Sequence, residues 1–386
     1  MWKAKGSVRY FLSILATAFV QMGVFIYAQK ILSGSFSNAE SGQTWQTFML
    51  QIFFVAPFVL MIWPAGFFTS RFSKNKVLAW SSLFMTLFVT AQAVLVTCDC
   101  PRVAFWLAIG LSSGFAVHSA AKYAIIREMF GVHNLSYANA FLQIFSLIGI
   151  IASSWLAIVG VNLIDLQALV RYEAVGVIIS KSVVIPWILV TVSVLGTVAS
   201  FLIPKVKYND KNIKFSVARR RLSFGWRHRT LRASIIALSM FWALAQVFLL
   251  VFQDVSGSQT VNTMQNYLAF AVVGLVVGSI IAAHNSKDFI ETGFVPLGMI
   301  GASLCMFLIP FFVHPVALSI LYTAIGIFGG MFLVPVNALL QYNTRPNNSG
   351  WVIALANMIQ ALVLVVFLFI YSSLVRYTSL EPSYYF

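Results

Sequence analysis

The sequence predicts an all-α integral membrane protein with about eleven transmembrane helices, and its composition and its apolar runs carry this prediction. Of its 386 residues, 60% are apolar and 9% are charged, whereas a soluble globular chain is about 45–50% apolar and about 25% charged. The mean hydropathy is +0.88. This composition excludes a soluble enzyme, a nucleic-acid-binding domain and a disordered chain.

The predicted spans follow from the length of the apolar runs, because a helix that crosses a membrane needs about 20 mostly apolar residues. The first run follows three basic residues, as in a signal peptide. It is too long for a signal peptide and has no small-residue cleavage site, so we expect an uncleaved span. The runs cover residues 10–31, 46–69, 77–97, 103–121, 137–160, 182–203, 232–253, 264–283, 292–312, 316–339 and 352–375.

The basic residues predict the orientation of these spans. If the N-terminus is cytoplasmic, 20 of the 25 Lys and Arg fall in cytoplasmic segments and five fall on the other side. Basic residues mark the cytoplasmic side of membrane proteins, so the net charge of +15 indicates topology and no nucleic-acid partner. We expect the N-terminus inside and, with an odd number of spans, the C-terminus outside.

A strongly basic segment divides the predicted helices into two halves. We expect an N-terminal six-helix half over residues 1–203, a basic cytoplasmic linker over 204–231, and a C-terminal half with five helices over 232–386. The linker is also able to attract anionic lipid headgroups, at about 1 kcal/mol per basic residue near the surface. Glycines four residues apart predict close helix packing. These are Gly110 with Gly114, Gly274 with Gly278, and Gly326 with Gly330.

Three motifs resemble those of a known family. Residues 66–76, GFFTSRFSKNK, are similar to the Gly-x-x-x-Asp-Arg loop signature of the major facilitator superfamily, with Ser70 in the place of the Asp. Residues 119–125, SAAKYAI, resemble the Ser-Pro-Ala-Lys-Tyr-Gly-Ile run of its bacterial lysophospholipid transporter family. Residues 334–341, VPVNALLQ, are close to that family's Val-Pro-Leu-Asn-Ala-Leu-Leu-Gln, and 352–357 resemble its Ile-Ala-x-x-Asn continuation.

The sequence departs from this family at two charged positions and in its span count. Residues 19–22, FVQM, lack the acid that family members carry in a Phe-Gly-Asp-Asn run of the first span. Residues 241–248 lack the arginine often found around span seven. Because the acid and the base are both lost, no unpaired ion is left within the spans. The family has twelve spans, and we find eleven, which indicates a lost span or a truncated reading frame.

The resemblance implies that spans one, four, seven and ten line a central cavity, where amides and hydroxyls supply the polar contacts. The same side chains also have structural interpretations. The glutamines are able to form hydrogen bonds between helices, and His118 is able to serve as a packing residue. Lys122 either contacts a substrate phosphate or anchors its helix at the membrane surface. The candidate substrate-binding residues are Gln21, His118, Lys122, Gln246, Asn337 and Gln341, with Ser112 and Ser113 as further polar groups.

The candidate gating residues lie at predicted cytoplasmic helix ends. We expect Arg127 and Glu128 to form an inner gate with Arg71, or else to anchor the helix at the membrane surface. No nucleotide-binding loop, catalytic triad or metal-ligand spacing is present in the sequence, so we expect no enzyme, no cofactor and no metal.

The resemblance implies a lysophospholipid transporter in the bacterial inner membrane. It would move lysophosphatidylethanolamine or a similar lipid inward by alternating access, for reacylation by a separate acyltransferase or acyl-carrier-protein ligase. No Asp or Glu lies in the middle of a predicted span, which argues against proton coupling. The alternatives are a small-solute or drug transporter of the same superfamily, and a membrane scaffold without transport activity.

Overall fold

The computed structural model places its described residues in helices, without a strand. The chain folds into two compact units. Unit 1 comprises Met1–Pro57, Asn75–His118 and Phe145–Lys205, and unit 2 comprises Phe58–Lys74, Ser119–Ile144 and Val206–Phe386. The predicted halves follow the covalent order of the helices and stay a prediction. The structure describes residues 4–35, 43–98, 100–162, 181–206, 218–255, 261–286, 289–312 and 314–377.

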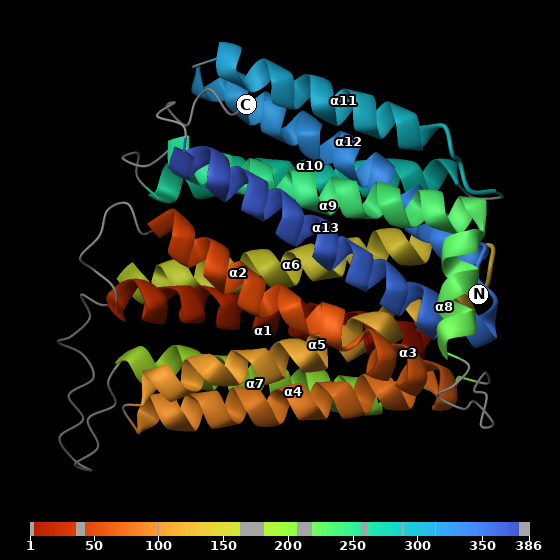
Figure 1. Ribbon diagram of the computed structural model, residues 1–386, viewed down its shortest axis with the longest axis horizontal. Helices are drawn as coiled ribbons and strands as arrows, with labels where there is room; N and C mark the ends of the chain where they lie inside the picture. The colour runs from red at the N-terminus through yellow and green to blue at the C-terminus, as the bar shows by residue number, and fades with distance from the viewer. Residues whose placement is uncertain are drawn as a thin grey trace. The chain divides into compact units, whose positions relative to one another are not determined.

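Each predicted apolar run falls on a helix or a helix pair (Figure 1). Ten helices are long and apolar enough to cross a membrane, or eleven when the bent pair α2–α3 is one span. The predicted count is therefore confirmed within the described residues. The helices are α1 (Ala4–Ser35), α2 (Gln43–Leu60), α3 (Ile62–Arg71), α4 (Lys74–Thr97), α5 (Pro101–Phe130), α6 (Leu135–Asn162), α7 (Lys181–Phe201), α8 (Ala218–Arg227), α9 (Arg229–Val255), α10 (Val261–Asn285), α11 (Phe294–Leu308), α12 (Pro315–Tyr342) and α13 (Ser349–Tyr377).

The second run is broken where the sequence suggested one continuous span. Helices α2 and α3 meet at Met61 with a bend of 49°. Pro64 explains the break, because a proline has no N–H for the carbonyl four residues earlier, here that of Leu60, and its ring clashes with that carbonyl. The break places α3 in unit 2.

The basic linker contains a helix that its composition did not indicate. Helix α8 packs against α13 and α9 within unit 2, and Figure 1 shows it across the end of α9. The side chain of Arg221 donates a hydrogen bond to the carbonyl of Asn347, with an Nη1–O distance of 2.6 Å. At least part of the linker is therefore bound to the helices that follow it.

Hydroxyl groups join α7 to α1 and α4 in unit 1. The Oγ atoms of Ser13 and Ser200 lie 2.5 Å apart, and Ser82 is 3.1 Å from Ser200. Thr86 lies 2.7 Å from Ser193 and 2.8 Å from Thr197. Lipid offers no partner to a hydroxyl, so such pairs link helices within a bilayer.

Glycines bring α10 and α12 together in unit 2. A Cβ atom at Gly274 or Gly278 would overlap the backbone of α12, and one at Gly326 or Gly330 would overlap the backbone of α10. The packing role predicted for these four glycines is thus confirmed, since no larger residue fits at this distance between the helices.

Candidate functional site

A cluster of buried polar side chains joins early and late segments of the chain within unit 2. We call it the polar cluster. It links the end of α5, the start of α4 and the start of α6 to the end of α12 and the turn that follows. Its members are Lys74, Arg127, Glu128, Asn139 and Gln341.

Lys74 and Glu128 form a buried ion pair. Each side chain is only 2% exposed, and Nζ of Lys74 also lies 3.4 Å from the carbonyl oxygen of Pro346. Either charge alone would pay a desolvation cost of several kcal/mol at this site, so each depends on the other. Lys74 thereby connects the start of α4 to the end of α5 and to the turn between α12 and α13.

Arg127 binds the C-terminal end of α12. Its Nη1 donates to the carbonyls of Gln341 at 3.2 Å, Tyr342 at 2.9 Å and Thr344. The last carbonyls of a helix have no partner within the helix, and the helix dipole makes this end negative. A guanidinium satisfies both requirements, so Arg127 serves as a cap donated by another helix.

Asn139 and Gln341 form a reciprocal amide pair between α6 and α12. Each Nδ2 or Nε2 donates to the other's side-chain oxygen at 2.9 Å, and both side chains are buried. A second amide contact lies between α13 and α5, where Nδ2 of Asn357 donates to Oγ of Ser119 at 3.1 Å. These two neutral pairs add hydrogen bonds of defined direction to the contacts that the charged side chains of the polar cluster make.

Close packing of α3 on α13 adds apolar contacts beside the polar cluster. The hydrogen atoms of Gly66 face the indole of Trp351, and a Cβ there would overlap the ring. A Cβ at Gly350 would lie 3.0 Å from Oγ of Ser70. Ser70 stands where the superfamily signature has an Asp, so a small buried hydroxyl faces the start of α13 in place of a carboxylate.

The gating residues are not joined as the sequence suggested. Glu128 pairs with Lys74 and not with Arg71. The Arg71 side chain is exposed, and its Cζ lies 5.4 and 5.9 Å from the ring centroids of Phe67 and Phe72. The exposed end of α3 explains the difference, because the guanidinium keeps its hydration there.

Two predicted substrate-binding residues belong to unit 1. Gln21 is exposed on α1. His118 is buried on α5, where Nδ1 lies 3.2 Å from Oγ of Ser81 and 3.4 Å from Oγ of Ser82. These contacts fit its reading as a packing residue. The predicted pairing of Gln21 with Gln246 stays a prediction, since Gln246 is in unit 2.

The other predicted substrate-binding residues lie in unit 2. Lys122 is half-buried, with Nζ 5.0 Å from the ring centroid of Tyr123, and Gln246 is half-buried on α9. Asn337 is buried and donates from Nδ2 to the carbonyl of Leu333 at 2.9 Å. Of the six residues, the structure therefore brings Gln341 alone into the polar cluster.

Sequence reasoning missed Lys74 and Asn139 as site residues. Lys74 was counted among the 20 basic residues of the predicted cytoplasmic segments. A usable signal is the scarcity of acids: the chain has ten, and Glu128 is the one found in the described candidate spans. An acid within a span commonly pairs with another charged side chain, and here Lys74 is that partner.

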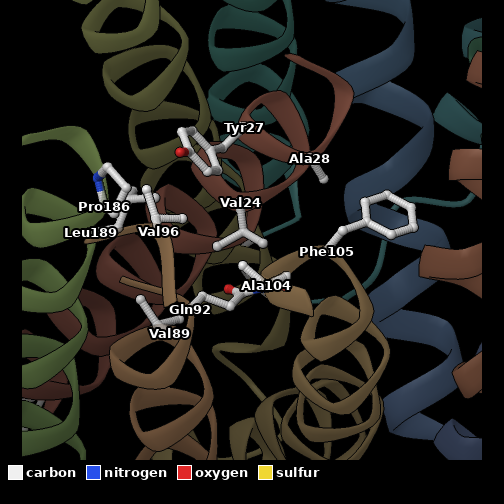
Figure 2. Close-up of a pocket in the computed structure, with 10 residues that line it drawn as sticks. All are labelled: Val24, Tyr27, Ala28, Val89, Gln92, Val96, Ala104, Phe105, Pro186 and Leu189. Carbon is white, nitrogen blue, oxygen red and sulfur yellow. Dashed lines mark hydrogen bonds between the residues drawn. The ribbon is translucent and has the colours of Figure 1, made fainter. Parts of the chain in front are cut away.

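A cavity in unit 1 is too small to be a substrate site. Figure 2 shows it among α1, α4, α5 and α7, and its volume is about 20 Å³, room for about one water molecule. The amide of Gln92, which faces it, donates to the carbonyl of Ala104 at 3.0 Å. In the described part of the chain, no three His, Cys, Asp or Glu residues lie close enough to hold a metal ion.

The comparison with known proteins decides the family. A model of the Major Facilitator Superfamily matches residues 10–368. The chain belongs to the major facilitator superfamily. Among curated proteins, it is 26% identical over 352 residues to the lysophospholipid transporter LplT of Photorhabdus laumondii, covering 88% of this chain and 82% of that protein. It is 27% identical to LplT of Klebsiella pneumoniae subsp. pneumoniae, covering 85% and 79%.

Solved transporters of this superfamily share the fold. The proton:xylose symporter XylE matches with a TM-score of 0.73 at 13% identity, covering 99% of this chain and 92% of that one. The human organic anion transporter MFSD10 matches with a TM-score of 0.71 at 12% identity, covering 98% and 96%. The chain is thus a multi-pass membrane transporter, and its resemblance to the lysophospholipid transporters extends along most of its length.

Proposed function

We propose that this transporter moves lysophospholipid, such as lysophosphatidylethanolamine, inward across the bacterial inner membrane. The observation that carries this substrate is the likeness to proteins named lysophospholipid transporter over 85–88% of the chain. The apolar composition of the spans agrees with it, because a single acyl chain prefers an apolar path and its headgroup needs only a few polar contacts. A separate acyltransferase or acyl-carrier-protein ligase would then reacylate the product.

In this proposal, the polar cluster is the cytoplasmic gate of an alternating-access cycle. It joins segments before residue 144 to segments after residue 340 through an ion pair and hydrogen bonds, each of which involves a side chain. Such bonds break and re-form without unfolding a helix, as rocking of two halves requires. With the N-terminus in the cytoplasm, the basic residues of this end lie inside.

Transport would need no proton gradient. Intramembrane carboxylates are the usual proton relays of transporters. Glu128 is the one acid in the described candidate spans, and Lys74 neutralises it. The energy for inward movement would come from the lipid's own gradient and its removal by reacylation.

Reconstitution tests this function. Purified protein in vesicles receives fluorescent lysophosphatidylethanolamine in the outer leaflet, and transfer to the inner leaflet is measured by dithionite quenching, with and without a proton gradient. We expect protein-dependent transfer that the gradient leaves unchanged. Absence of transfer under both conditions would refute the lysophospholipid assignment for this lipid, and transfer only with a gradient would refute the uncoupled mechanism.

A further inference from the structure

An apolar cavity lies among α9, α10, α11 and α12 of unit 2. Its volume is about 230 Å³, against about 20 and about 10 Å³ for two cavities among α1, α4, α5 and α7 of unit 1. No charged side chain lines it, and its polar side-chain atoms belong to Trp242, Ser303 and Tyr322. A cavity of this composition excludes charged ligands and stays dry, because water needs two to four polar partners.

The floor of the cavity is rigid and aromatic. Tyr322 is fully buried, and its ring centroid lies 5.4 Å from that of Tyr267 and 5.6 Å from that of Phe248. Gly329 borders the same space, and a Cβ there would lie 3.3 Å from Cζ of Phe241. The glycine keeps open a volume that any side chain would reduce.

The rim of the cavity is apolar and accessible. Trp242 on α9 is 39% exposed, and Met299 on α11 is 42% exposed. Both helices are candidate membrane spans, and in the proposal below these exposed side chains face the apolar phase of the bilayer. A lipid chain is therefore able to enter from the side without crossing a polar barrier.

The volume of the cavity limits which apolar groups are able to bind in it. A cavity of about 150 Å³ lined by Leu, Ile and Phe binds benzene, so about 230 Å³ takes a somewhat larger apolar group. A helix with its side chains is about 10 Å wide, and this volume would hold only about two of its residues. A segment of an unbranched acyl chain, narrow and uncharged, fits both the volume and the lining.

We propose that this cavity binds the acyl chain of the transported lysophospholipid. The inference rests on the function proposed above and adds the part of the substrate that the cavity recognises. A one-chain lipid places its single acyl chain in the cavity, whereas a two-chain lipid would leave its second chain outside. We therefore expect one-chain lipids to bind in preference to two-chain lipids.

Quenching of Trp242 by bromine atoms tests this proposal directly. Vesicles of unbrominated phospholipid receive a few mole per cent of lysophosphatidylethanolamine with a dibrominated acyl chain, and tryptophan fluorescence is compared between the native protein and Trp242→Phe. We expect quenching that saturates and that Trp242→Phe removes. Dibrominated diacyl phosphatidylethanolamine at the same mole fraction should give weak quenching that does not saturate.

Two cavity-filling variants and their matched controls complete the test. Ser303→Phe and Ala245→Phe reduce the cavity and should raise the half-saturating lysolipid concentration about tenfold, the loss expected when about two methylene groups leave an apolar site. Leu304→Phe and Ile236→Phe lie on the same helices at exposed positions outside the lining and should leave it unchanged.

Three other outcomes would overturn the acyl-chain site, and a fourth would refute the transport function. Equal quenching by the two brominated lipids would show a site for bulk lipid. Cross-linking of Ser303→Cys between two copies of the chain, without quenching, would show a protein interface. Lysolipid transfer in vesicles without saturable quenching at Trp242 would refute this site and leave the transport function standing, whereas saturable quenching without transfer would refute the function.

Discussion

At the scale of single residues, the buried ion pair of Lys74 and Glu128 makes the strongest prediction. Lys74→Met removes one charge and leaves the carboxylate of Glu128 buried without its cation. We expect the free energy of unfolding to fall by about 3–5 kcal/mol, the cost of breaking a buried pair from one side. Denaturant unfolding in detergent, followed by tryptophan fluorescence, measures it.

The controls separate charge from packing. Lys76→Met changes an exposed lysine two residues away and should shift stability by about 0.5 kcal/mol or less. The double variant Lys74→Met with Glu128→Leu removes both charges and should recover most of the loss. A double variant as unstable as Lys74→Met would contradict the ion-pair explanation.

The amide pair of Asn139 and Gln341 makes a second prediction at this scale. Gln341→Leu leaves the buried Oδ1 of Asn139 without its donor, while Nδ2 keeps its bond to the carbonyl of Leu135. An unsatisfied buried acceptor costs about 1–3 kcal/mol, which the same unfolding assay measures. Asn139→Leu combined with Gln341→Leu removes both polar groups and should be nearly as stable as the native protein. Additive losses in the double variant would show that the two amides act independently.

Sequence patterns identified the residue types of the site better than their partners. Arg127 and Glu128 were predicted as gating residues because they lie at the predicted cytoplasmic end of a span, and both lie in the polar cluster. Lys74 was missed because a basic loop residue ordinarily marks topology. The partner of a buried charge depends on which helix ends meet, and that information is absent from local patterns.

At the scale of helices, the contact between α3 and α13 depends on Gly66. Gly66→Ala places a methyl group against the indole of Trp351 and should push the two helices apart. Overpacking of this kind costs about 1–3 kcal/mol, which the same unfolding assay measures. Gly293→Ala is the matched control, because the nearest atom to its Cβ, at 3.1 Å, is the end of the flexible Glu291 side chain. An equal fall in the free energy of unfolding in the two variants would contradict overpacking against Trp351 as the cause.

The helices were predictable to different degrees for physical reasons. A bilayer requires long apolar runs, so the spans could be found from hydropathy alone. The break at Met61 was missed because one proline lowers the mean hydropathy of a long apolar run too little to divide it. Helix α8 was missed because its basic composition resembles a topogenic linker, while its position comes from its packing against α9 and α13.

At the scale of the whole molecule, the proposed transport cycle requires the polar cluster to open. The three native cysteines are first replaced by alanine. Ser119→Cys with Asn357→Cys then puts a thiol on each side of a contact in which Nδ2 of Asn357 lies 3.1 Å from Oγ of Ser119. A disulfide there would hold α5 to α13. We expect oxidation to stop lysolipid transfer in vesicles and reduction to restore it.

A second disulfide shows whether this block comes from the gate or from rigidity in general. Ser13→Cys with Ser200→Cys joins α1 to α7 within unit 1, where the native hydroxyls are 2.5 Å apart. No gate opens between these two helices in the proposed cycle, so transfer should continue in the oxidised protein. Transfer that persists with α5 bound to α13 would mean that substrate passes without opening the polar cluster, and alternating access through this end would be wrong.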